Sequence, residues 1–186
     1  MRETSDVRRK IALFAIGLLC AVGRIAAQSS TTEVPLGGGQ RLVFTHPASW
    51  THETAGPAAA PTLTLHGPRG NEFRLLITSL PLTNSALSDE KILEEKVRQA
   101  GEALLGTAEQ KTLELIPVRG ATAHGFVYHL TDRSPEQTPN DYREMRQGVI
   151  SAGPVLLSVT LLTHPGDAAN VAAGLETLAG VTVRKD

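Results

Sequence analysis

The sequence predicts an α+β fold: a three-layer α/β/α sandwich with a central antiparallel sheet of about six or seven strands and a helix on each face. Short segments of alternating apolar residues follow one another across short turns, a pattern that indicates an antiparallel sheet. Two amphipathic segments with helical spacing must each bury an apolar face against such a sheet. The segment 154–163 is apolar at every odd position from Val155 to Leu161 and at some even positions. This pattern is typical of a strand covered on both faces, so we expect it at the centre of the fold.

The first 27 residues have the organisation of a secretory signal peptide. Four basic residues precede an apolar stretch at 11–22, and Ala27 supplies a small residue at the expected cleavage position. The apolar stretch is shorter than the roughly 20 residues that a spanning helix needs, so we expect no stable membrane span after cleavage. The pair Arg8-Arg9 leaves the twin-arginine export route open beside the general one. The mature protein is therefore expected to begin at Gln28 and to be periplasmic or secreted.

The mature chain is expected to hold one domain. Residues 28–39, which end in three glycines, are predicted to be a flexible lead, and residues 40–186 a single domain. The one cysteine, Cys20, lies in the signal segment, so the mature chain has no disulfide and no thiolate metal site. The whole chain carries a net charge of −1, and removal of the basic leader makes it more acidic. A nucleic-acid partner is not expected, because such partners require clustered Lys and Arg.

The predicted strands fall into two groups. Three precede the long helix and five follow it, at 41–45, 62–66, 72–80, 111–118, 122–133, 142–150, 154–163 and 181–183. A turn at His46–Trp50 ends the first strand, because Pro47 cannot donate a hydrogen bond to a strand ladder. The segment 51–61, rich in Ala, Pro and Gly, is predicted to be a loop.

Both helices have recognisable ends. The first is predicted over 88–105, with Ser88 as its cap and Gly106 as its stop. Its apolar stripe consists of Ile92, Leu93, Val97, Ala100, Leu104 and Leu105. The second helix begins at Asp167 and places Val171, Leu175 and Leu178 on one face. We expect one helix on each face of the sheet.

This order of elements, together with three short motifs, resembles the PsbP-like superfamily, which includes PsbP, the Ran-binding Mog-type proteins and exported bacterial domains. The motifs are the Pro-to-Trp turn at His46–Trp50, the Val118-Arg-Gly turn before an aromatic strand, and the Leu178-Ala-Gly-Val tail. The likeness covers residues 40–183. It implies an α/β/α sandwich around an antiparallel sheet and a non-enzymatic binding or assembly role. The superfamily has no shared catalytic motif to carry over to this chain.

The turn from His46 to His52 is the candidate binding site. Its two histidines are close by necessity, and imidazole is the commonest transition-metal ligand in proteins. Trp50, the only tryptophan, is in one interpretation an anchor for a ligand or partner. In the other it plugs the end of the sandwich, with its indole N–H donating to a loop carbonyl. The remaining histidines are expected at exposed strand ends, without a metal site: His66, His124, His129 and His164.

Ser151 is the candidate for a catalytic nucleophile. It lies in Gly148-Val-Ile-Ser-Ala-Gly153, one residue off the nucleophile-elbow spacing and in a hairpin instead of a strand-to-helix turn. We therefore expect neither an enzyme nor a cofactor. The sequence predicts an exported, non-enzymatic binding or assembly-accessory protein of the cell envelope, with a protein or a small ligand as its partner. A ligand or metal binder using His46, Trp50 and His52 is the first alternative, and a serine hydrolase is the second.

Overall fold

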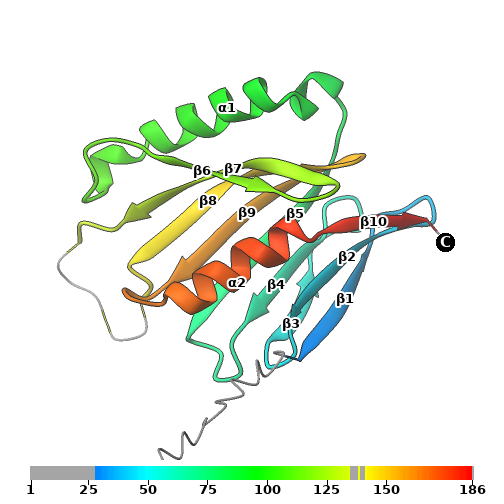
Figure 1. The fold of residues 1–186 in the computed structure, drawn as a ribbon, viewed down its shortest axis with the longest axis horizontal. Helices are drawn as coiled ribbons and strands as arrows, with labels where there is room; N and C mark the ends of the chain where they lie inside the picture. The colour runs from blue at the N-terminus through cyan, green and yellow to red at the C-terminus, as the bar shows by residue number, and fades with distance from the viewer. Residues whose placement is uncertain (1–27, 135–137, 139–140, 186) are drawn as a thin grey trace, which may run out of the picture.

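The computed structural model describes residues 28–134, 138 and 141–185, so the predicted signal peptide lies outside the described residues. The described chain forms two antiparallel sheets and two α-helices (Figure 1). The larger sheet comprises β3 (Thr51–Ala55), β4 (Thr62–His66), β5 (Phe73–Pro81), β6 (Leu115–Arg119), β7 (Ala123–Thr131), β8 (Glu144–Ala152) and β9 (Val155–Thr163). The smaller sheet comprises β1 (Ser29–Pro35), β2 (Gln40–Pro47) and β10 (Thr182–Lys185). The helices are α1 (Glu90–Glu102) and α2 (Ala168–Ala179), and short 3-10 turns at Ser85–Ser88 and Leu105–Thr107 flank α1.

Strand β9 occupies the centre of the larger sheet, as the sequence predicts. The strand order is β3-β4-β5-β9-β8-β7-β6, so three strands lie on either side of β9. Leu157 is completely buried, and its direct neighbours are Ser79 on β5 and Ile150 on β8. The alternation of apolar residues along β9 therefore reflects its place in the main hydrophobic core.

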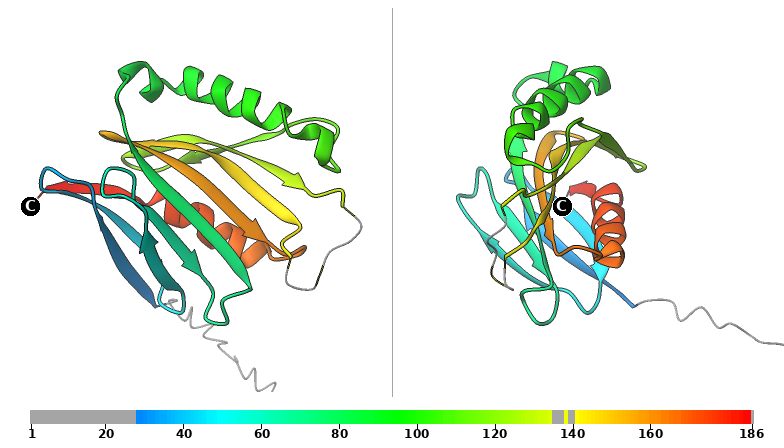
Figure 2. Two further views of the ribbon diagram at one scale, coloured as in Figure 1. Left: turned by 180° about the vertical axis from the view of Figure 1, so that it is seen from behind. Right: turned by 90° about the vertical axis from the view of Figure 1, so that its left-hand side faces the viewer.

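The predicted layers are confirmed, with an addition. On one face, which we call the inner face, α2 and the smaller sheet together cover the larger sheet (Figure 2). Phe44 of β2 and Leu178 of α2 pack into the same core cluster as Leu157. On the opposite, outer face, α1 packs mainly against β6, β7 and β8, and Leu156 of β9 joins the same apolar cluster. The helix on this face therefore leaves part of the sheet without cover.

The predicted flexible lead is wrong for most of its length, because Ser29–Pro35 forms strand β1. This strand pairs with β2 along its whole length, and Val34 is 1% exposed. The glycines at 37–39 form the turn between the two strands, with backbone φ angles of 73°, 63° and 68°. This left-handed region favours glycine, so the triple glycine makes a tight hairpin instead of a linker.

Two further element boundaries differ from the sequence prediction. Residues 51–55, predicted as loop, form the edge strand β3, in which every residue is exposed. Helix α1 is capped by Asp89 instead of Ser88, since the Asp89 carboxylate accepts from the backbone N–H groups of Lys91 and Ile92 at 3.0 and 3.2 Å. Ile92, predicted in the apolar stripe, is 37% exposed.

Within the described residues, neither helix is long and apolar enough to cross a bilayer.

Candidate functional site

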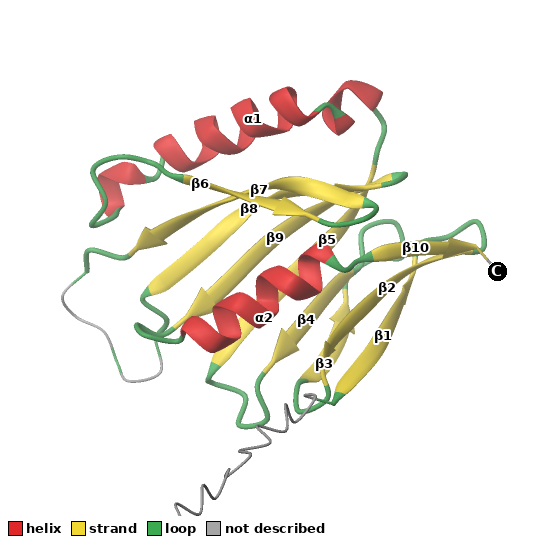
Figure 3. Cartoon of the chain, viewed as in Figure 1, coloured by secondary structure: helices red, strands yellow, loops and turns green. Residues whose placement is uncertain are grey.

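The turn between β2 and β3 carries the chain from the smaller sheet into the larger one (Figure 3). His46 lies at the end of β2 and is 3% exposed, whereas His52 on β3 is exposed. The two imidazole rings lie with their centroids 6.3 Å apart. The structure therefore brings together the two histidines that the sequence predicts to be close.

Trp50 is buried among aromatic rings. It is 6% exposed, lies 4.5 Å from Phe73 between ring centroids, and stacks on His46 at 6.2 Å with an interplanar angle of 10°. Its backbone N–H donates to the Pro47 carbonyl at 3.0 Å. The burial of the ring agrees with the interpretation in which Trp50 plugs the end of the sandwich, although the hydrogen bond to Pro47 comes from the backbone N–H and not from the indole.

Thr32 of β1 joins the two histidines of the turn. Its hydroxyl oxygen lies 2.9 Å from Nε2 of His46 and 3.3 Å from Nδ1 of His52. Nδ1 of His46 lies 3.0 Å from the Pro47 carbonyl oxygen, which only accepts. In neutral His46, therefore, Nδ1 donates to Pro47, Nε2 accepts from the Thr32 hydroxyl, and the Thr32 oxygen accepts from His52.

This hydrogen-bond chain determines what the turn can bind. Three of the four ring nitrogens of His46 and His52 are engaged, and Nε2 of the exposed His52 has no partner among the described residues. No group of three or more His, Cys, Asp or Glu side chains in the described part of the chain is arranged to hold a metal ion. The turn thus offers a single imidazole nitrogen that has no hydrogen-bond partner among the described residues.

The other histidines are dispersed over the fold. Nδ1 of His66 forms a 2.9 Å hydrogen bond with the hydroxyl of Thr51. Nε2 of His164 donates a hydrogen bond to the Asn71 carbonyl oxygen at 2.9 Å. His129 lies on the inner face beside Glu144 and Arg146, and its Nε2 is 3.7 Å from the Glu144 carboxylate. Burial lowers the pKa of His129, the Arg146 charge lowers it further, and the Glu144 charge acts in the opposite direction.

Ser151 lies on β8 and is 2% exposed. Its direct neighbour on β7 is His124, the arrangement that a Ser–His pair would require. The His124 ring, however, bonds the backbone carbonyl of Ser88 through Nε2 at 2.8 Å. The partner base is therefore directed toward the turn before α1, and the hydroxyl of Ser151 is covered.

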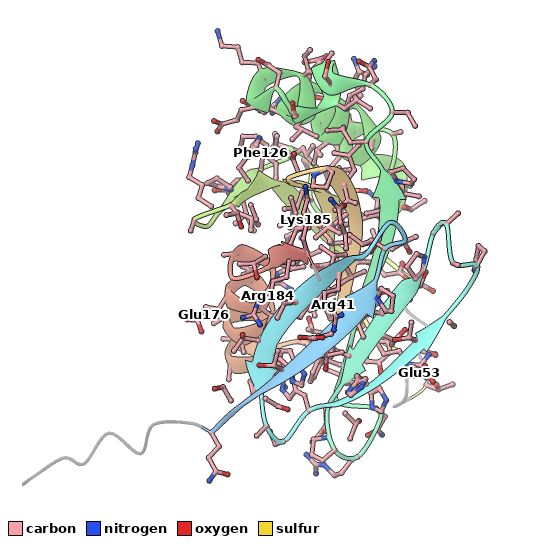
Figure 4. The ribbon with its side chains drawn as sticks, turned by 90° about the vertical axis from the view of Figure 1, so that its right-hand side faces the viewer. Arg41, Glu53, Phe126, Glu176, Arg184 and Lys185 are labelled. Atoms are coloured by element: carbon pink, nitrogen blue, oxygen red, sulfur yellow. The ribbon has the colours of Figure 1, made fainter. Side chains whose placement is uncertain are left out.

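The second candidate surface is the uncovered part of the outer face, which we call the open face. It consists of the outward side chains of β3, β4 and β5 together with Ser158 and Thr160 of β9, whereas Leu156 of β9 packs into the cluster beneath α1. Figure 4 shows Phe126 beneath α1 and Glu53 on β3, at the opposite edge of the sheet. Hydroxyl side chains dominate this surface: Thr51, Thr62, Thr64, Thr78, Ser158 and Thr160. Sequence reasoning missed it, because half-buried threonines alternate with core residues in the same way on any two-sided strand.

A polar chain marks the boundary between the helix-covered part and the open face. The hydroxyl of Tyr128 donates to Oε1 of Gln147 at 2.5 Å, and Nε2 of Gln147 donates to Thr160 at 3.4 Å. Burial raises the pKa of Tyr128, so this phenol stays protonated and remains a donor. On the open face itself, the hydroxyls of Thr62 and Thr78 bond each other at 2.9 Å across β4 and β5.

Comparison with known proteins gives a likeness to solved structures and to nothing else. No protein-family model matches the chain. No curated protein matches it either. Among solved structures, the chain is similar to cyanobacterial PsbP (CyanoP) from Synechocystis sp. PCC 6803, at 15% sequence identity and a TM-score of 0.49. The match covers 91% of this chain and 100% of the other. The likeness is one of fold alone.

Proposed function

We propose that the protein is an exported, non-enzymatic binding or assembly-accessory protein of the cell envelope, and that the open face is its binding surface. One observation carries this proposal: α1 packs mainly over β6, β7 and β8 of the outer face, and the apolar cluster beneath it includes no described residue of β4 or β5. A two-sided sheet normally has both faces covered or one face strongly polar. The open face is neither, since Leu76 and the 40% exposed Leu80 lie among its threonines.

The physical character of the open face supports binding of a protein. Most of its side chains are short or branched and sit on a sheet of seven strands, so few rotamers would be lost when a partner covers them. Mixed hydroxyl and apolar groups are also the usual composition of a non-obligate interface. Such a surface can match the shape of a partner protein without a change in its own backbone conformation on binding.

The test places a photo-crosslinking amino acid at Thr64, in the middle of the open face, and in a control at the exposed Glu95 on α1. Crosslinking is performed in the envelope of the host cell, and the captured protein is identified and purified. We expect capture at position 64 only, and loss of binding to the purified partner in Thr64→Arg with unchanged Tm. Equal capture at positions 64 and 95, or full binding of the purified partner by Thr64→Arg, would exclude the open face as the binding surface.

A second candidate function is binding of a metal ion or small ligand by the turn that contains His46, Trp50 and His52. The observation that favours it is the exposed, unpartnered Nε2 of His52. Zn²⁺ or Cu²⁺ would then raise Tm in the wild type and not in His52→Ala, with His164→Ala as a control at a distant histidine. An identical rise in all three proteins would remove this candidate.

A further inference from the structure

A hollow lies where α1 ends over the outer face. It has a volume of about 310 Å³ and opens between the C-terminal end of α1 and the ends of β7, β8 and β9. Its apolar lining includes Leu104, Ala108, Leu130, Tyr142, Met145 and Leu162. A space of this size is at the lower end of the range for small-ligand sites.

The floor of the hollow continues as a straight row across the sheet. Leu130, Met145 and Leu162 are direct neighbours on β7, β8 and β9. The next residue in the row is Arg74 on β5, opposite Leu162, followed by His66 on β4. Directly opposed side chains on neighbouring strands are about 5 Å apart, so Arg74 borders the mouth of the hollow.

The charges around the hollow differ in whether they are already paired. Arg143 on the wall donates to Oε1 of Glu109 at 2.5 Å, and Oδ1 of Asp132 accepts from the backbone of Ser134 at 2.8 Å. Arg74 is exposed and has no hydrogen bond or ion pair with any other described residue. The site thus combines an apolar hollow with one uncompensated cation at its mouth.

From this juxtaposition we propose that the hollow binds the alkyl chain of an anionic amphiphile, with a carboxylate or phosphate on Arg74. The guanidinium group would donate two hydrogen bonds to the anion. A water molecule takes about 30 Å³ of liquid volume and a methylene group is of similar size, so the hollow accommodates a tail of roughly ten carbons. This inference rests on the proposed binding role of the outer face and names a ligand class for it.

The test measures binding of saturated fatty acids of six to fourteen carbons to the full mature chain by isothermal titration calorimetry. Burial of each methylene should tighten Kd about fourfold until the hollow is full near ten carbons, after which the gain should stop. Decanoate should bind about tenfold more tightly than decanol, and Arg74→Gln should remove that difference. Lys96→Gln, which removes an exposed cation from α1, should change nothing.

A second variant tests the hollow itself. Met145 and Leu162 are only partly buried, so Leu162→Gln should fold and bind decanoate at least tenfold more weakly. Vesicles of phosphatidylglycerol distinguish the source of the ligand: binding to vesicles indicates lipid, and binding to monomeric acid alone indicates free fatty acid.

A chain-length series without a plateau, or equal Kd values in wild type, Arg74→Gln and Leu162→Gln, would overturn the inference. If the amphiphile fails while Thr64 still captures its partner protein, only this inference falls.

Discussion

The hydroxyl of Thr32 lies 2.9 Å from Nε2 of the buried His46, and this contact fastens the edge strand β1 to the turn that joins the two sheets. We expect Thr32→Val to destabilise the protein by about 1–3 kcal/mol, because a buried ring nitrogen then loses its partner. Thr32→Ser, which keeps the hydroxyl, should lose much less. Urea denaturation of the three proteins gives the comparison, and a Val variant as stable as the wild type would show that the contact contributes nothing.

Leu157 tests the place of β9 in the fold. Its side chain is fully buried in the central strand of the larger sheet, so Leu157→Ala should lower the free energy of unfolding by about 2–5 kcal/mol. Chemical denaturation with an unchanged m-value is the measurement. A loss under about 0.5 kcal/mol would be incompatible with a core position.

Gly148 lies where β7 and β8 approach closely. A Cβ atom at this position would come within 1.9 Å of the Phe126 carbonyl oxygen and 2.7 Å of Cα of Val127, both backbone atoms of β7. Gly148→Ala should therefore cost about 1–3 kcal/mol or more, because one of the central strands must move. Gly106→Ala is the matched control, since nothing lies within 4 Å of its Cβ position. Equal Tm values for the two variants would contradict this account of the packing.

His129 makes the stability of the protein dependent on pH. Its pKa in the folded protein lies below the unfolded value of about 6.5, mainly because of burial and then the Arg146 charge. As the pH falls below 6.5, the unfolded chain binds a proton that the folded protein resists, so stability decreases from there down through the folded pKa. At higher pH the imidazole is neutral in both states, and the residue adds no pH dependence.

The variant His129→Gln isolates this effect. Its free energy of unfolding should change less than that of the wild type between pH 7.5 and pH 5.5, since the titrating group is gone. Denaturation curves at the two pH values measure the difference. A wild-type protein that became more stable toward pH 5.5 through this residue would mean that Glu144 outweighs burial and Arg146.

The elements with an apolar face were predictable from the sequence, and those without one were not. Val155 to Leu161 identified the central strand because alternate side chains enter the core. Strand β3 gave no such signal, since all its residues are exposed. Strand β1 buries little besides Val34 and Thr32, and the pairing of β10 with β2 joins the two ends of the described chain. Pairing over such a sequence distance leaves no local pattern to read.

The candidate site was predictable to the same degree. A single turn forces His46 and His52 together, which the sequence alone implied. The third member, Thr32, lies on β1, in a segment that the sequence predicts to be a flexible lead, so residue spacing gives no sign of its contacts with the two histidines. The open face depends on how far α1 extends across the sheet, which is a property of packing that residue spacing does not encode.

The measurement that tests the proposed function most directly is native mass spectrometry of the protein from the envelope fraction of its host, together with sequencing of its N-terminus. The account predicts a mature chain that begins at Gln28 and carries the additional mass of a partner protein or an amphiphile. An unprocessed chain beginning at Met1 in the cytosolic fraction would contradict export. A processed chain that carries no additional mass, even after crosslinking from Thr64, would contradict a binding role.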